Sequence, residues 1–160
     1  MSNISSKDVH VPLHLRIDAT RQILQLIRGD KIEKSYPVST SHFGLGSEPG
    51  SNKTPLGRFV VSEKIGANAV PGAVFKSRLA SGEIASQGGD EDLVLTRILW
   101  LAGLDESNAN TKERYIYIHG TNHEALLGTP ASHGCIRMSN ADVVECFDRI
   151  PEGTPVEIVT

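Results

Sequence analysis

The chain has 160 residues, a length that suits one domain with a single hydrophobic core. Its formal net charge is −3 at pH 7, and its lysines and arginines form no cluster along the sequence. These properties argue against nucleic acid as a partner, because a protein that binds nucleic acid needs a basic face to contact the phosphates.

The beginning of the chain has no targeting pattern, because no basic start followed by an apolar run is present. The longest apolar cluster, residues 98–104, is far too short to cross a bilayer. We therefore expect no membrane partner and a cytoplasmic location, or a periplasmic one if a leader was removed. Residues 1–8 are expected to form a loose terminus before a single domain at 9–160.

The first part of the chain predicts strands. Apolar residues alternate over 11–17, which is the period of a strand that buries one face. Residues 22–29 and 31–40 predict two more strands that are joined by a tight turn at Gly29-Asp30. Residues 41–57 are rich in Gly, Ser and Pro, so a long loop is expected before the next strand.

The middle of the chain is less regular. Residues 57–66 predict a strand, whereas residues 66–92 contain several glycines and show no decisive pattern. Residues 93–103 favour a strand, although an apolar run of this kind also suits a buried helix. Residues 114–120 predict a short strand that has Tyr117 and His119 on the same face.

The end of the chain predicts one helix and one strand. Residues 140–150 have an apolar face and follow a polar N-cap, and residues 154–159 predict the last strand. The fold class expected from these elements is a mostly β sandwich or barrel with one main helix and long loops.

The chemistry concentrates in residues 118–138. His119 ends a predicted strand, and the Gly120 carbonyl can accept a hydrogen bond from its ring and fix the tautomer. Further along come His133, Gly134 and Cys135, so a thiol lies beside a flexible backbone and an imidazole. A thiol becomes a nucleophile when a nearby base activates it, and backbone N–H groups at 134–135 could hold an oxyanion.

The two cysteines differ in their surroundings. Cys135 is expected to have an accessible thiol with a lowered pKa, because imidazoles and Arg137 are close to it in sequence. Cys146 lies on the apolar face of the predicted helix beside Phe147, and we expect a buried structural residue.

Other interpretations of these residues remain open. Cys135 could instead be a small core residue, and Arg137 could pair with a surface acid rather than with a substrate carboxylate. A zinc site is a further alternative, although the spacing of its ligands is not a standard one; its candidate ligands are His119, His123, His133 and Cys135. Some histidines are expected only to satisfy loop hydrogen bonds, namely His10, His14, His42 and His123.

His119-Gly120 followed by SHGCIRM at 132–138 closely resembles the signature of the L,D-transpeptidase catalytic domain. Residues 11–40 are similar to the opening hairpins of that family, and TPLGRF at 54–59 resembles its Thr-Pro-x-Gly-x-Phe loop. The resemblance covers nearly the whole chain. It implies a β-sandwich-like fold and a cysteine acyl-enzyme that uses no metal and no other cofactor.

The resemblance also implies roles for single residues. Cys135 would be the nucleophile and His119 the general base, with the Gly120 carbonyl as its orienting group. His133 and Gly134 would shape the oxyanion site. The candidate substrate contacts are Ser132, Arg137 and Tyr117.

The resemblance implies cleavage of the bond between the L-centre of a diamino acid, usually diaminopimelate, and the terminal D-alanine of a peptidoglycan stem. The expected partner is thus a stem peptide or muropeptide, and the oligomeric state stays open. Combined with a cytoplasmic location, this predicts an L,D-carboxypeptidase of peptidoglycan recycling, in which water attacks the acyl-enzyme. The alternatives are a periplasmic L,D-transpeptidase, which forms cross-links or attaches proteins to the wall, and a non-catalytic muropeptide-binding module.

Overall fold

The structure is a computed structural model that describes residues 11–160, so the terminus predicted at 1–8 and the residue His10 lie outside the described part. The strands are β1 (Leu13–Asp18), β2 (Ile23–Arg28), β3 (Lys31–Pro37), β4 (Gly57–Ile65), β5 (Ala73–Lys76), β6 (Leu79–Ile84), β7 (Val94–Gly103), β8 (Tyr117–Gly120), β9 (Ile136–Met138) and β10 (Pro155–Val159). The helices are α1 (Asn140–Arg149) and two short 3-10 turns, η2 (Glu106–Asn108) and η3 (Glu124–Leu126).

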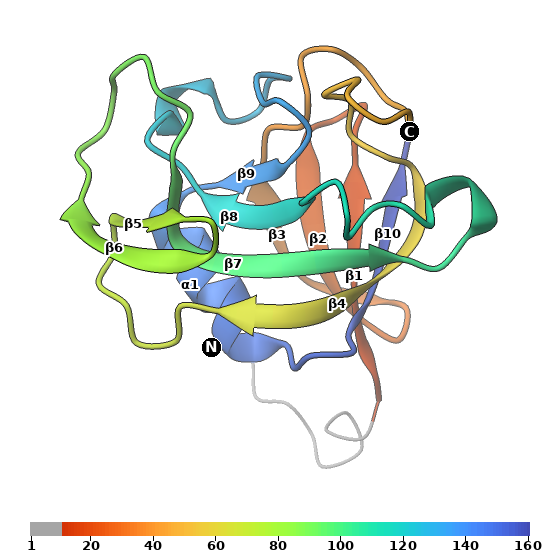
Figure 1. Ribbon diagram of the computed structural model, residues 1–160. Coiled ribbons are helices and arrows are strands. Elements are labelled where there is room, and N and C mark those ends of the chain that lie inside the picture. Colours follow the sequence, from red (N-terminus) through yellow and green to blue (C-terminus); the bar gives the residue numbers. More distant parts are fainter. Residues whose placement is uncertain (1–10) are drawn as a thin grey trace.

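The strands join into one mixed sheet that folds over itself. Its order is β3-β2-β1-β10-β4-β7-β5-β6, with β8 on β7 and β9 on β8. The pairs β1–β10 and β8–β9 are parallel. In Figure 1, β4, β7 and β8 cross in front of β1, β2 and β3, so the sheet forms two layers. The expected fold, a mostly β sandwich with one main helix, is confirmed.

The main core lies between the layers and under α1. It combines the apolar faces of both layers with one face of the helix, and full burial of such side chains contributes about 1.5–3 kcal/mol each. Its members include Leu15, Ile17, Leu24, Leu26, Phe59, Val61, Leu99, Leu101, Ile118, Ile136, Val143, Phe147, Val156 and Ile158. Cys146 belongs to the same cluster and is fully buried, as predicted.

The helix begins where the sequence predicts it. Ser139 is the N-cap, and its hydroxyl accepts a hydrogen bond of 3.0 Å from the backbone N–H of Asp142. This cap satisfies one of the free N–H groups of the first turn. The helix packs against β7 and β8 and therefore supports the strand that ends in His119 and Gly120.

Other expectations are refined by the structure. The run at 93–103 is a strand, β7, and not a helix; it lacks a clear alternation because both of its faces are covered. The undecided segment at 66–92 contains the β5–β6 hairpin, whose second strand is exposed throughout and therefore shows no apolar period. The strand expected at 114–120 begins only at Tyr117, and the short strand β9 was not predicted.

Among residues 11–160, no helix has the length and apolar character that a membrane span requires.

Candidate active site

The site is built on the parallel strand pair β8–β9. His119 pairs with Arg137, and Ile118 pairs with Ile136. Side chains alternate along a strand, so Ile118 and Ile136 enter the core while the residues on either side of them share the opposite face. This register places Tyr117 and His119 of one strand beside Cys135 and Arg137 of its neighbour. The thiol and the imidazole are thus diagonal neighbours across two strands.

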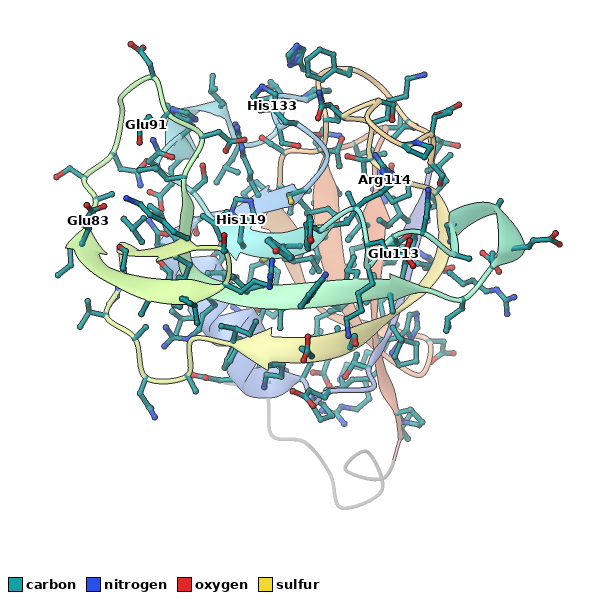
Figure 2. The ribbon with its side chains drawn as sticks, viewed as in Figure 1. Glu83, Glu91, Glu113, Arg114, His119 and His133 are labelled. Carbon is teal, nitrogen blue, oxygen red and sulfur yellow. The ribbon has the colours of Figure 1, made fainter. Side chains whose placement is uncertain are left out.

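His119 is held as a neutral base. Its Nδ1 lies 2.6 Å from the Gly120 carbonyl oxygen, as predicted. A carbonyl only accepts, so Nδ1 carries the proton and Nε2 is left to receive one. Burial lowers the pKa of the His119 imidazole, against the opposing effects of the Gly120 carbonyl and the Asp92 charge. Figure 2 shows His119 beside β8, with β7 alongside.

Gly120 is required by close packing. A Cβ atom at this position would collide with Asn140 Oδ1 and would lie 2.8 Å from the Leu95 carbonyl oxygen. Both approaches are closer than any real contact of this kind, so a side chain here would push β8 away from β7 and α1. That displacement would also move the carbonyl that orients His119.

The Cys135 thiol is partly exposed and is bound by two backbone groups. Its Sγ accepts from the Tyr117 N–H and donates to the Tyr115 carbonyl, both at 3.3 Å. Desolvation raises the pKa of this thiol to about 12, and the Tyr117 N–H only partly offsets it. The expectation of a lowered pKa is therefore wrong. The nearby cations and imidazoles do not outweigh the loss of water around the sulfur.

The loop before Cys135 is fixed by its own polar groups. The Ser132 hydroxyl donates to the Cys135 carbonyl at 2.5 Å and accepts from the Gly134 N–H at 3.2 Å. Thr54, from the TPLGRF segment, donates through its hydroxyl to the Gly134 carbonyl at 2.9 Å. Gly134 has a φ of +127°, a conformation that other residues rarely adopt. The segment that resembles the family loop therefore supports the backbone next to Cys135.

One backbone donor of the loop is available for an oxyanion. The Gly134 N–H is occupied by Ser132, whereas the Cys135 N–H has no acceptor among residues 11–160. An unengaged N–H on a residue whose sulfur attacks a carbonyl would lie close to the oxygen that becomes negative. The predicted oxyanion donors at 134–135 thus reduce to the N–H of Cys135.

Asp92 links the remaining charged groups of the site. Its carboxylate lies 2.9 Å from His133 Nδ1 and 2.8 Å from Arg137 Nη2. Burial would raise the pKa of this carboxyl, but the Arg137 charge, the neighbouring His119 ring and the two hydrogen bonds hold it below its usual value. The imidazole of His133 lies toward the surface, at the top of the molecule in Figure 2.

The predicted substrate contacts are mostly enclosed. The side chain of Arg137 is 2% exposed, and its Nε and Nη1 atoms have no partner in the described part of the chain. Ser132 is also buried, and its hydroxyl is already engaged. The Tyr117 hydroxyl accepts from Arg78 Nη1 at 3.0 Å. In this conformation the side chains of Ser132 and Arg137 support the site from within. Neither exposes enough surface to contact a substrate directly.

A cavity of about 290 Å³ opens beside the nucleophile loop. His133 and Ile116 line one part of it, and Arg114 with Pro49, Gly50 and Asn52 lines the other. The Arg114 guanidinium donates to the backbone carbonyl of residue 53 at 2.7 Å and so anchors this loop. Its charge also acts on the nucleophilic thiol. The cavity is large enough for a short piece of peptide next to His133.

The histidines of the described chain do not gather as a metal site. Among residues 11–160, no group of three or more His, Cys, Asp or Glu side chains has an arrangement that would hold a metal ion. His123 Nε2 lies 2.7 Å from the Gly89 carbonyl, which is the loop contact expected for this residue. The ring of His42 packs on Phe43, with a centroid distance of 3.9 Å.

Several residues of the site carry no recognisable sequence signal. Asp92 is one of three acidic residues in the stretch GGDED at 88–92, and nothing in the sequence distinguishes it from the other two. The backbone groups of Tyr115 and Tyr117 that hold the thiol could be supplied by any residue type. Only the strand register identifies these contacts, and β9 is too short to be recognised from its pattern.

Comparison with known proteins identifies the family of this chain. The YkuD family model, described as the L,D-transpeptidase catalytic domain, matches residues 12–158. YqjB of Bacillus subtilis is 33% identical over 84% of this chain and 64% of its own length. YkuD of the same organism is 26% identical over 92% of this chain and 66% of its own length. The names of both relatives assign them to the L,D-transpeptidases, and the chain spans slightly less than two thirds of each.

A solved structure confirms the fold. The L,D-transpeptidase LdtMt1 in complex with imipenem superimposes with a TM-score of 0.59 and 20% identity, over 93% of this chain and 59% of that one. With the family model covering residues 12–158, and the cysteine and histidine set on one strand pair, the chain belongs to the L,D-transpeptidase catalytic domain family.

Proposed function

We propose that this protein is an L,D-carboxypeptidase that removes the terminal D-alanine from peptidoglycan tetrapeptides through an acyl-enzyme on Cys135. The observation that carries the proposal is the shared face of β8 and β9, where a base with a fixed tautomer lies diagonally beside a thiol. Membership of the family supports peptidoglycan stems as the substrate class.

The steps follow from the positions of the atoms. His119 Nε2 takes the thiol proton while Sγ attacks the carbonyl of the diamino acid's L-centre. The Cys135 N–H stabilises the oxyanion. The C–N bond to D-alanine then breaks, and the proton on His119 passes to the departing amine. In the second half, His119 takes a proton from water while the water oxygen attacks the thioester carbonyl. The C–S bond then breaks, the tripeptide leaves as a carboxylic acid, and the proton on His119 returns to the sulfur to restore the Cys135 thiol.

The choice of water as acceptor is supported by a loop that is held in place next to the site. Residues 87–93 are tied to the segment after β8, because Asn122 Nδ2 donates to the Gly88 and Glu91 carbonyls at 2.9 Å each. Asp92 ties the same loop to His133 and Arg137. A second peptide stem needs an open approach to the thioester, whereas water does not.

The compartment is part of the same proposal. Cross-linking needs acceptor stems of the wall, whereas hydrolysis needs only soluble muropeptides such as those released during wall turnover. We therefore propose a role in peptidoglycan recycling in the cytoplasm. A periplasmic transpeptidase is the competing function, and family membership supports it equally.

The deciding experiment is mass spectrometry of the products from a disaccharide-tetrapeptide. We expect a disaccharide-tripeptide, free D-alanine and one 18O atom from labelled water. A cross-linked dimer that loses one D-alanine and gains no 18O would establish a transpeptidase instead. Cys135→Ala should abolish turnover, and Cys146→Ala is the matched control because it removes the other thiol, which is buried in the core. Stem binding by the native protein without any turnover would point to the non-catalytic module.

A further inference from the structure

The turn between β5 and β6 holds an arginine in an unfavourable backbone conformation. Ser77 has a φ of 48° and Arg78 a φ of 66°, so two consecutive residues are left-handed and neither is glycine. Two-residue hairpin turns of this kind strongly favour Asn-Gly, because the left-handed region is strained for residues with a Cβ. An arginine kept in such a place needs a reason beyond the turn itself.

Aromatic rings hold the Arg78 side chain in one position. Its guanidinium carbon lies 4.7 Å from the centroid of the Trp100 ring and 4.9 Å from that of Tyr115. Nη1 donates to the Tyr117 hydroxyl at 3.0 Å. Cation–π contacts and one hydrogen bond thus fix the cation over the start of β8 without neutralising its charge.

The same tyrosines connect Arg78 to the nucleophile. The backbone of Tyr117 donates to Cys135 Sγ, and the backbone of Tyr115 accepts from it. The Tyr115 ring and the Tyr117 hydroxyl, which both contact the guanidinium, therefore belong to the two residues whose backbones hold the thiol. Arg78 is therefore joined to the thiol through two residues of one short segment, 115–117.

Arg78 also lacks an acidic partner. Among residues 11–160 it forms no ion pair with a carboxylate, and Glu63, whose charge acts on it, is paired with Lys112 at 3.6 Å. Most other arginines of the described chain are neutralised by a nearby carboxylate; these are Arg16, Arg21, Arg28, Arg58, Arg137 and Arg149. Arg78 is thus a positioned and partly exposed guanidinium without a carboxylate partner, and it lies against the two tyrosines that hold the thiol.

We infer that Arg78 binds a carboxylate of the acyl-donor peptide and thereby selects donors that carry one. The inference rests on the proposed function and adds a specificity residue to it. A guanidinium that stacks through its face still presents its edge to a carboxylate. The carboxylate has two possible sources with the same chemistry, namely the far centre of the diamino acid and the terminal D-alanine.

The test measures peptide binding through Trp100, the only tryptophan of the chain, which lies under Arg78. Cys135→Ala protein prevents turnover during the titration. Three tetrapeptides are compared: one with free carboxylates, one amidated at the far centre of the diamino acid, and one amidated at D-alanine. Each is titrated into Cys135→Ala, into Cys135→Ala with Arg78→Gln, and into Cys135→Ala with Ser77→Asn as the matched turn control.

We expect Arg78→Gln to weaken binding of the free tetrapeptide about 10- to 100-fold, the usual effect of losing a charge-assisted hydrogen bond. One of the two amidated peptides should already bind weakly when Arg78 is present, and Arg78→Gln should weaken its binding no further. The position of the amide in that peptide identifies the carboxylate that Arg78 binds. Ser77→Asn should bind all three peptides as its parent does.

If Arg78→Gln weakened the binding of all three peptides equally, Arg78 would only stabilise the β5–β6 hairpin, and the inference would be overturned. Unchanged binding of the free tetrapeptide would overturn it as well, while leaving the proposed function intact. If no peptide bound to Cys135→Ala and the native enzyme processed none, the proposed function would fail and the inference with it.

Discussion

Replacing Asp92 by asparagine removes the one carboxylate that serves both His133 and Arg137. The Arg137 side chain is 2% exposed, so it would become a buried cation without an anionic partner. Removing one partner of a buried pair typically costs about 3–5 kcal/mol. The Asp92 side chain is 32% exposed, which favours the lower end, about 3 kcal/mol. For a chain of this size, such a loss lowers the melting temperature by about 6–12 °C.

Thermal unfolding followed by circular dichroism measures this loss, and the dependence on pH tests its cause. The pKa of Asp92 is lowered in the folded protein from its ordinary value of 3.8. A lowered pKa means that the carboxylate stabilises the fold above about pH 4 and that this contribution disappears as the pH falls through the folded value. The difference in melting temperature between wild type and Asp92→Asn should therefore be complete at pH 7 and become smaller below about pH 4.

Asp90→Asn is the matched control, because Asp90 is an exposed residue of the same loop and forms no ion pair within residues 11–160. It should melt within about 1 °C of wild type, as surface substitutions usually do. Equal melting temperatures for the two variants, or a gap that persists undiminished at about pH 3, would refute the role given to the Asp92–Arg137 pair.

Three further predictions concern the thiol and its neighbours. Alkylation of Cys135 by iodoacetamide should accelerate about tenfold per pH unit between about pH 7 and 9, since the thiol pKa of about 12 lies above this range. A plateau of the rate near neutral pH would contradict that pKa. Faster labelling of the buried Cys146 would contradict the assignment of Cys135 as the reactive thiol. If the proposed acyl-enzyme forms on Cys135, a strained β-lactam such as imipenem should acylate it and add its mass to the native protein and to Cys146→Ala but not to Cys135→Ala; an unchanged native mass would count against acyl-enzyme chemistry. Arg137→Lys should lower the melting temperature, because a lysine does not fill the space of the buried guanidinium that reaches Asp92. A large loss of tetrapeptide turnover at unchanged stability would restore Arg137 as a direct substrate contact.

The parts of the site that the sequence predicts depend on residues that are close along the chain. The contact between His119 and the Gly120 carbonyl joins neighbours, and the core position of Cys146 follows from the helical period. The strands whose single apolar face alternates were predicted for the same reason. The hairpin at 73–84 was missed because its second strand buries neither face.

The parts that could not be predicted depend on packing between distant segments. Asp92 reaches His133 and Arg137 from a loop that is far away in the sequence, and Arg78 reaches Trp100 from another. The direction of the pKa shift of the Cys135 thiol could not be predicted for the same reason. Proximity of imidazoles and arginines in the sequence favours a lowered value, whereas desolvation, which only the folded chain determines, raises it.

The protonation states indicate how the proposed reaction is triggered. With a raised pKa for Cys135 and a lowered pKa for His119, the resting pair is a neutral thiol and a neutral imidazole. Asp92 disfavours the thiolate and favours the imidazolium, since its charge raises both pKa values. A free thiolate is therefore costly, whereas a proton on His119 is supported. This combination suits a step in which the sulfur gives up its proton only as it bonds to a carbonyl, so that its negative charge passes at once to an oxyanion at the Cys135 N–H.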